Sequence, residues 1–420
     1  MSKRLFALIA ILVLVTPLVA ACGATPEPAQ PTAAPQAAEP TTAAEPTAAE
    51  PAASSEPIKI GVTTPLSPPA DVQAGEINVN TVKLAIQHLN EQGGALGRQF
   101  QEVIVDDMGD TATGVSAVTK LISEDKVSAI VGAWHGSVAL AQSQVAAEQK
   151  VPILLHYSWP DDITAMHSDF VFRVSPYNSQ IAALLIPFMK EQGYKNVAVM
   201  AEDSAYGTGF ADGLTKVAAA EGIEVTTRVF PAESMDLSPQ LLELKSLTPP
   251  VDLLVVAAVY QPMYLIPKQA REVGLECDIM AGWDYPGWSP DFWATAGEAG
   301  VGVFFPTFYS TALNLTPLGT KFKEAYNAAY GHEPPIYAYY LYDEVLMVAE
   351  AITKGGSADP GKVAENLKTL EFEGTTGMIK FESRDTPGDP VWNQWLGQQV
   401  FIMRPTAVGQ MQEDDEIVWP

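Results

Sequence analysis

The chain has 420 residues, of which 24 are basic and 50 acidic, and its formal net charge at pH 7 is −26. A body of this charge is repelled by nucleic acid and by anionic lipid head groups, so the composition excludes functions that depend on a basic surface. The length favours two domains or lobes over one ordinary core. A hydrophobic fraction of 47% is sufficient to build them.

The first 22 residues have the features of a bacterial lipoprotein signal peptide. Lys3 and Arg4 precede an almost wholly apolar run from residue 5 to residue 19, which is too short to span a membrane. Small residues then lead to Cys22, which resembles the lipobox cysteine that is lipidated and becomes the mature N-terminus. An ordinary signal peptide with a nearby cysteine is the alternative. We expect Cys22 to anchor an exported protein on the outer face of the cell membrane, in an extracellular or periplasmic position.

Residues 23–57 predict a disordered tether between this anchor and the folded body. From residue 24 onward they are almost only Ala, Pro, Thr, Glu, Gln and Ser, and no apolar side chain exceeds Ala in size. Loss of Lys3 and Arg4 leaves a mature formal charge of 22 − 50 = −28. Cys277 is the only cysteine after Cys22, so no disulfide forms within the body, which depends on its core for stability.

From residue 58 onward, apolar strands alternate with amphipathic helices in two successive series. The expected strands of the two series are 58–66, 100–108, 127–134, 151–157 and 170–176, then 196–203, 224–230, 252–260 and 278–283. Continuous apolar strands separated by helices indicate parallel sheets that are covered on both faces. We therefore predict an α/β fold of two doubly wound parallel-sheet lobes, with a ligand cleft between them and multiple interlobe crossovers.

The last third of the chain departs from this rhythm. One further strand near 301–309 precedes three helices, and short strand segments with turn signals follow. The chain is expected to cross between the lobes more than once. The predicted division assigns residues 58–176 and 307–376 to lobe 1, residues 177–306 and 377–410 to lobe 2, and residues 411–420 to an acidic C-terminal tail.

Ligands of open parallel sheets bind beyond the carboxyl ends of the strands, and polar and aromatic residues gather there. The candidate ligand-binding residues are His135, Gly136, Ser137, Tyr157, Ser158, Trp159, Tyr206, Tyr260, Trp283 and Asp284. Structural roles are the alternative, with the rings in the core and Ser137 at a helix start, although a helix start also binds a carboxylate. Asp284 could be a turn acid, but Ser289 before Pro290 is better placed to cap the next helix. This leaves Asp284 available for a ligand.

Catalytic signatures are weak in this sequence. It contains no Gly-x-Ser-x-Gly motif, no Walker loop and no His-x-x-x-His pair. The glycines within residues 207–213 have the wrong spacing for a dinucleotide loop and favour close packing at a helix start. His135 and His156 end neighbouring strands, but no third metal ligand lies close in sequence. We expect neither enzymatic activity nor a cofactor or metal site.

The folded body resembles the leucine/isoleucine/valine-binding family of ABC-transporter solute receptors, which have the type I periplasmic-binding fold. The likeness extends from residue 58 to about residue 404. Its most specific segments are IKIGVTTPLS, VSAIVGAWHGSVALAQSQVAAEQKVPIL, VAVMAEDSAYGTGFADGL and KQAREVG. The resemblance implies a monomer with two lobes linked by three crossovers. It also implies an amino acid or similar small molecule as ligand and an ABC permease as partner.

The resemblance also assigns roles to individual positions. It places the ligand carboxylate at Gly136–Ser137 and at residues 157–159, the ligand ammonium at Asp284, and aromatic contacts at Tyr206 and Tyr260. Relatives that bind leucine often have a small residue and a threonine where this chain has Tyr157, Ser158 and Trp159. Some relatives also have a disulfide near the positions of Gly109 and His135.

These departures leave the identity of the ligand open. One possibility is an amino acid with a branched-chain, other apolar or aromatic side chain. The alternative is another small polar or aromatic ligand, such as an amide, a urea-like compound or an aromatic acid. Two further alternatives concern the role of the chain. It could be a ligand-sensing subunit of a signalling system, or a hydrolase with Asp284 as its acid.

Overall fold

The computed structural model describes residues 56–283, 289–310 and 312–420, without the side chain of Tyr260. The predicted signal peptide with Cys22, nearly all of the predicted tether, and Asp284 lie outside the described residues. No helix in the described ranges is long and apolar enough to cross a membrane.

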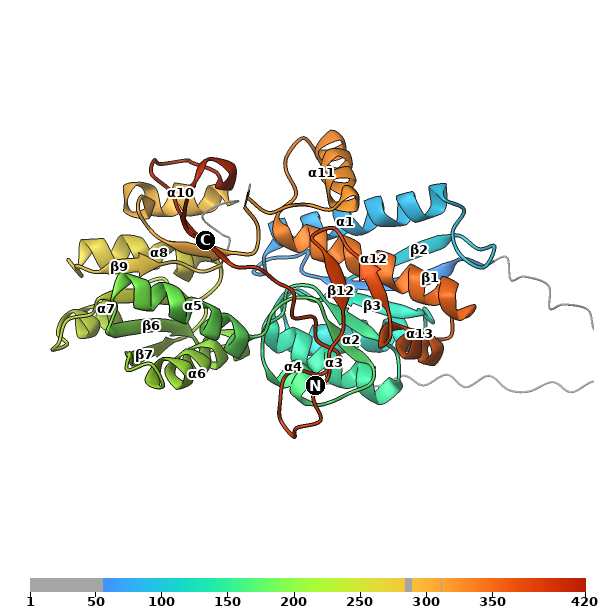
Figure 1. Ribbon diagram of the computed structural model, residues 1–420, viewed down its shortest axis with the longest axis horizontal. Helices are drawn as coiled ribbons and strands as arrows, with labels where there is room; N and C mark the ends of the chain where they lie inside the picture. Colours follow the sequence, from blue (N-terminus) through green and yellow to red (C-terminus); the bar gives the residue numbers. More distant parts are fainter. Residues whose placement is uncertain (1–55, 284–288, 311) are drawn as a thin grey trace, which may run out of the picture. The chain divides into compact units, whose positions relative to one another are not determined.

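The first parallel sheet has the strand order β2-β1-β3-β4-β5 (Figure 1). Its strands are β1 (Ile58–Thr64), β2 (Phe100–Asp106), β3 (Ala129–Gly132), β4 (Ile153–Leu155) and β5 (Val171–Arg173). The intervening helices are α1 (Val72–Glu91), α2 (Thr111–Ser123), α3 (Gly136–Gln149) and α4 (Asp162–Ala165). Asp71 and Asp110 cap α1 and α2 with side-chain oxygens that accept backbone N–H bonds. The central strands β3 and β4 are buried at every residue, as continuous apolar runs require.

The second parallel sheet repeats this pattern with the strand order β7-β6-β8-β9. Its strands are β6 (Asn196–Glu202), β7 (Glu224–Phe230), β8 (Leu253–Ala257) and β9 (Asp278–Met280). The helices of this region are α5 (Asn178–Gln192), α6 (Ala205–Ala219), α7 (Ser238–Lys245), α8 (Tyr260–Glu272) and α10 (Pro290–Ala296). Ser289 precedes α10 as predicted, but its hydroxyl contacts the Tyr264 hydroxyl at 3.1 Å and does not cap the helix. The predicted architecture of two doubly wound parallel sheets is confirmed.

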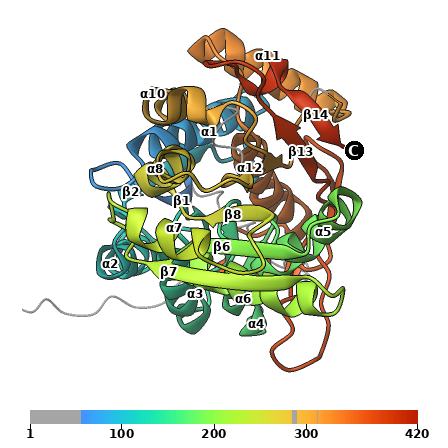
Figure 2. The ribbon, with the colours of Figure 1, turned by 90° about the vertical axis from the view of Figure 1, so that its left-hand side faces the viewer.

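The last third of the chain returns to both sheets. Its elements are η1 (Gly297–Gly300), β10 (Phe305–Thr307), α11 (Pro317–Tyr330), α12 (Ile336–Gly355), α13 (Pro360–Leu367), β11 (Glu371–Glu373), β12 (Met378–Lys380), β13 (Phe401–Arg404), η2 (Gln412–Asp414) and β14 (Glu416–Trp419). Helix α12 packs against α1 and against β3 and β4 (Figure 1). Strands β10, β13 and β14 instead form an antiparallel sheet, of which Figure 2 shows β13 and β14 side by side. The predicted tail at residues 411–420 thus contains a short helix and a paired strand.

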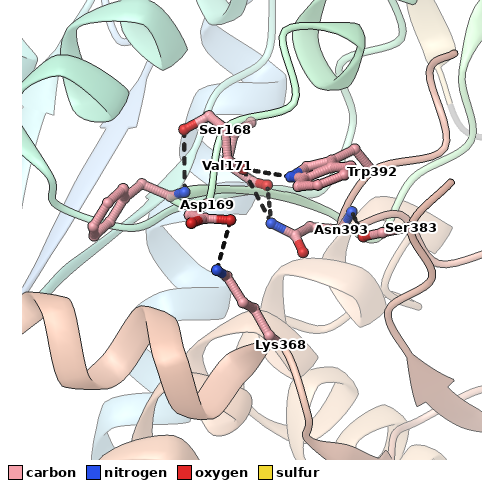
Figure 3. Close-up of polar contacts among 8 residues, drawn as sticks. Ser168, Asp169, Val171, Lys368, Ser383, Trp392 and Asn393 are labelled. Carbon is pink, nitrogen blue, oxygen red and sulfur yellow. Dashed lines mark hydrogen bonds and ion pairs between the residues drawn. The ribbon is translucent and has the colours of Figure 1, made fainter. Parts of the chain in front are cut away.

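A segment at residues 391–395 extends the edge of the first sheet beside β5. The backbone N–H of Arg173 donates to the Asn393 carbonyl at 3.0 Å, and the N–H of Trp395 donates to the Arg173 carbonyl at 3.0 Å. Figure 3 shows the Asn393 amide donating to the carbonyls of Ser168, at 3.1 Å, and Val171, at 3.2 Å. We expected this segment in lobe 2, but its hydrogen bonds hold it on the first sheet, so the chain leaves that sheet only after Trp395.

Candidate functional site

A cavity of about 650 Å³ lies at the carboxyl ends of both parallel sheets. Its volume falls within the roughly 300–1,000 Å³ that is usual for small-molecule sites. The cavity brings together eight of the candidate residues, namely His135, Gly136, Ser137, Tyr157, Ser158, Trp159, Tyr206 and Trp283. Their role in ligand binding stays a prediction, as does that of Tyr260 and Asp284.

On the side of the first sheet, the start of helix α3 faces the cavity. Residue 135 is the N-cap of α3, and no side chain caps the helix. The backbone N–H groups of Gly136, Ser137 and Val138 have no hydrogen-bond partner among the described residues, and all three residues line the cavity. A Cβ atom at position 136 would lie 2.8 Å from Pro160 Cγ, which explains the glycine. This helix start offers partial positive charge and free donors to an anionic group.

Aromatic rings form much of the cavity wall. Trp134 stacks on Tyr157 with ring centroids 4.8 Å apart, and Trp283 stacks on Phe308 at 4.7 Å. Trp159 stands edge-on between the two stacks, 4.9 Å from Tyr157 and 5.4 Å from Trp283. Its indole Nε1–H is buried and has no hydrogen-bond partner in the part of the chain that the structure describes. The wall therefore combines apolar ring surface with one unused donor.

Ser158 lines the cavity, but its hydroxyl is hydrogen-bonded within the protein. Its hydroxyl donates to the Ala133 carbonyl at 2.8 Å, and the residue is 1% exposed. Two carbonyls of the same loop, those of Ser158 and Pro160, accept hydrogen bonds from the guanidinium of Arg173 at 3.5 and 2.8 Å. Arg173 is completely buried, and its hydrogen bonds hold the loop that carries Tyr157 and Trp159 in place.

On the side of the second sheet, the cavity is acidic. Glu202, Asp203 and Glu233 line it, whereas no Lys or Arg appears among its described lining residues. One carboxylate oxygen of Glu202 accepts a hydrogen bond from the Ser204 hydroxyl at 2.5 Å, and the other accepts one from the Val259 N–H at 2.9 Å. Burial raises the pKa of Glu202, which is only 3% exposed.

The candidate set omitted all three acids of this wall. Glu202 and Asp203 follow the last apolar residues of β6 directly, so the strand-end rule could have selected them. Glu233 lies in the loop between β7 and α7, and no motif in its surroundings indicated its position.

The histidines near the cavity carry no charge at neutral pH. Burial lowers the pKa of His135 to about 4 and that of His156 to about 3. His156 lies behind the cavity wall, with its Nδ1 atom 3.7 Å from Glu344 Oε2, and both side chains are fully buried. No group of three or more His, Cys, Asp or Glu side chains within the described ranges could hold a metal ion.

A hydrogen bond joins the two sides of the cavity. The N–H of Ala205, at the start of α6, donates to the Ser137 hydroxyl at the start of α3, over 3.2 Å. Next to it, the Asn178 amide donates to the carbonyls of Ala205 and Tyr206 at 3.3 and 3.2 Å. These contacts fix the ring of Tyr206 near Trp159, with centroids 5.4 Å apart.

Comparison with known proteins identifies the family. Residues 57–400 match the family model described as periplasmic binding protein. The leucine-, isoleucine-, valine-, threonine- and alanine-binding protein of Pseudomonas aeruginosa is 26% identical over 334 residues, which are 79% of this chain and 87% of that protein. A leucine-binding protein from Thermotoga maritima superposes with a TM-score of 0.73 at 28% identity, over 83% of this chain and 95% of that one.

A second solved structure, the branched-chain amino acid transporter substrate-binding protein of Streptococcus pneumoniae in complex with isoleucine, gives a TM-score of 0.73 at 26% identity. It covers 87% of this chain and 100% of the other. The residues that match the family model contain both parallel sheets and the described residues that line the cavity. The chain belongs to the periplasmic binding protein family.

Proposed function

We propose that this protein is an exported, lipid-anchored receptor, without catalytic activity, that binds an amino acid in the cavity and delivers it to an ABC permease. The opposed polarity of the cavity carries the proposal. Among the described lining residues, the N–H groups at the start of α3 have no partner and suit a carboxylate, and three acids without a Lys or Arg suit an ammonium group. The names of the Pseudomonas and Streptococcus proteins support an amino acid ligand.

The dimensions and lining of the cavity favour a bulky side chain on that amino acid. Five rings line it, namely Trp134, Tyr157, Trp159, Tyr206 and Trp283. Apolar ring surface gains most from a ligand that covers it, so an aromatic or long aliphatic side chain is favoured over that of alanine. An aromatic acid without an ammonium group is disfavoured, because its carboxylate would lie at the start of α3 and Glu202, Asp203 and Glu233 would have no positive charge to pair with.

Identification of the natural ligand tests this function. We expect mass spectrometry of the purified, denatured protein to release an amino acid, and calorimetry to show that this compound binds the refolded protein. Saturating ligand should raise the melting temperature, because it binds the folded chain and not the unfolded one. If neither co-purified compounds nor a panel of amino acids raises the melting temperature, the receptor assignment is wrong.

Asp284 is proposed as a direct partner of the ligand ammonium group. Its place in the sequence, immediately after cavity-lining Trp283, motivates this assignment. Loss of one member of a buried charge pair costs about 3–5 kcal/mol, so Asp284→Asn should weaken amino acid binding by at least roughly 100-fold. Equal affinity of the variant and the wild type for the released ligand would remove Asp284 from the site.

Cys22 is proposed as the site of lipid attachment. We expect Cys22→Ser to release the protein into the medium or to leave its signal peptide uncut, whereas the wild type sediments with membranes. Cys277→Ser is the matched control, because Cys277 lies within the folded body. Membrane retention of Cys22→Ser at the wild-type level would refute the anchor.

A further inference from the structure

We propose that Met108 and Met235 determine the specificity of the site: they contact the apolar side chain of the ligand at the mouth of the cavity and favour a long, straight-chain amino acid. This inference rests on the proposed function, because it names the ligand class of the same cavity. Both methionines line the cavity, Met108 after β2 of the first sheet and Met235 after β7 of the second. They are 43% and 59% exposed, which places them at its mouth.

The fold alone does not explain a methionine at position 108. Its φ is +54°, in the left-handed region that glycine adopts readily and that a residue with a Cβ atom disfavours. Asp106 Oδ1 accepts the Met108 N–H at 2.8 Å, and Asp107 Oδ1 accepts the Gly109 N–H at 2.9 Å, so the turn is held in this form. Glycine would fit the turn better, and an exposed side chain adds little to the core. Contact with a bound apolar group accounts for the methionine.

This turn lies beside the place proposed for the ligand carboxylate. A Cβ atom at position 109 would lie 2.7 Å from His135 Cε1, so Gly109 packs directly against the N-cap residue of α3. A ligand whose carboxylate binds the start of α3 therefore has the turn of Met108 next to it.

On the side of the second sheet, Gln269 fixes the backbone around Met235. The side-chain oxygen of Gln269 accepts the Leu237 N–H at 2.7 Å, and its side-chain nitrogen donates to the Met235 carbonyl at 2.9 Å. The side chain of Met235 is nevertheless the most exposed large hydrophobic side chain in the described ranges. A fixed backbone with a flexible, uncovered thioether side chain suits an apolar partner.

The exposed fractions decide where an apolar ligand group gains most. The rings of the cavity wall already cover one another, and exposed fractions of only 4% to 8% are found for Trp134, Tyr157, Trp159 and Trp283. Hydrophobic stabilisation is roughly proportional to the apolar area that is removed from water. Met108 and Met235 have much more of this area to lose than the rings. Lengthening the side chain of the ligand should therefore increase affinity mainly through contact with the two methionines.

Calorimetry with a homologous series tests the inference on the full-length protein. The probes are alanine, norvaline, norleucine and 2-aminoheptanoate, whose straight side chains lengthen in that order. We expect each added methylene to tighten binding about threefold, because each removes further apolar area from water. Leucine, an isomer of norleucine with a shorter reach, should bind less tightly than norleucine.

Variants of the two methionines separate this contact from structural damage. The combined substitution of Met108→Ala and Met235→Ala should weaken norleucine binding at least about tenfold and alanine binding less than about twofold. Met378→Ala is the matched control, because Met378 is 56% exposed but lies on β12, outside the described lining of the cavity. The control should leave both affinities unchanged.

Oxidation of the wild type by hydrogen peroxide gives an independent measurement. The peroxide transfers one oxygen atom to a methionine thioether, which becomes a sulfoxide, and is itself reduced to water. Saturating norleucine should slow this reaction at least about threefold at Met108 and Met235, and not at Met378, as measured by mass spectrometry of peptides. Saturating alanine should protect the two cavity methionines less.

An affinity that does not rise from alanine to norleucine would overturn the inference, and so would equal losses for both probes in the double variant. The receptor function would then still stand, because amino acids would have bound. Equal protection by alanine and norleucine would also overturn the inference, since closure of the mouth, and not the ligand side chain, would then cover the methionines. If no member of the series binds, the inference fails, whereas the receptor function is decided by the released compound.

Discussion

The two parallel sheets share a strand order, yet the helices that follow their third strands begin in different surroundings. Helix α3 follows β3 and α8 follows β8, and neither helix is capped by a side chain. At the start of α8, the N–H of Val259 already binds the buried carboxylate of Glu202. At the start of α3, the N–H groups of three cavity-lining residues have no hydrogen-bond partner within the described part of the chain.

This difference explains how a repeated fold makes a polarised site. A helix N-terminus favours an anion, and α8 receives one from its own sheet. Among the described residues the start of α3 has none, which leaves its N–H groups to the ligand carboxylate that we propose, while Glu202 lies on the second-sheet side. The first-sheet side is kept uncharged, because burial lowers the pKa of His135 to about 4. Duplication of the topology therefore need not duplicate the chemistry.

The largest expected effect comes from removing the buried guanidinium of Arg173, which donates to the Ser158 and Pro160 carbonyls next to the cavity. Arg173→Met should lower the free energy of unfolding by about 3 kcal/mol or more, because it removes the donor to Thr164 Oγ1 and Gln394 Oε1 and one of the two donors to the Pro160 carbonyl. Urea denaturation measures this loss. Arg384→Met is the control, since Arg384 is 57% exposed and 3.9 Å from Asp389, and it should cost about 0–1 kcal/mol. Similar losses in both variants would show that the loop does not depend on Arg173.

Acidification should lower the free energy of unfolding through His156, which follows β4 of the first sheet. The folded pKa of about 3 lies below the unfolded value near 6.5, so the unfolded chain binds a proton first as the pH falls. Stability present above pH 6.5 is therefore lost on acidification, by about 1.4 kcal/mol per pH unit between pH 6 and pH 4.

Replacement of His156 tests this dependence. His156→Gln should remove that slope, measured as the difference in unfolding free energy between wild type and variant at several pH values. The raised pKa of Glu344 acts in the opposite direction in both proteins and largely cancels in this difference. His332→Gln, at an exposed position, is the control. A difference that stays constant from pH 7 to pH 4 would argue against a neutral buried His156.

The smallest effect concerns the hydrogen bond that joins the two sides. Ser137→Ala removes the acceptor of the Ala205 N–H and should weaken binding of the released ligand by about fivefold, equivalent to roughly 1 kcal/mol. Ser116→Ala is the control, because its hydroxyl bonds to the Ala112 carbonyl on the exposed face of α2. Unchanged affinity in Ser137→Ala would mean that the bond between α3 and α6 does not contribute to the ligand-bound form.

Local sequence patterns determined the two parallel sheets and eight of the residues that line the cavity. Apolar runs such as β3 and β8 can lie only in sheets covered on both faces, and parallel strands bring their carboxyl ends to one edge. Residues that come shortly after such strands, such as His135 after β3 and Tyr206 after β6, could therefore be predicted to lie together. The position of Ser289 before α10 was also fixed locally, by Pro290.

Only the tertiary structure decided which charges and donors remain available to a ligand. The neutrality of His135, the buried bonds of Glu202 and the open start of α3 depend on partners far away in the sequence. The placement of residues 391–395 on β5 and of β14 on β13 has the same origin. Those short segments have no helical or alternating pattern of their own, and hydrogen bonds to distant strands fix their positions.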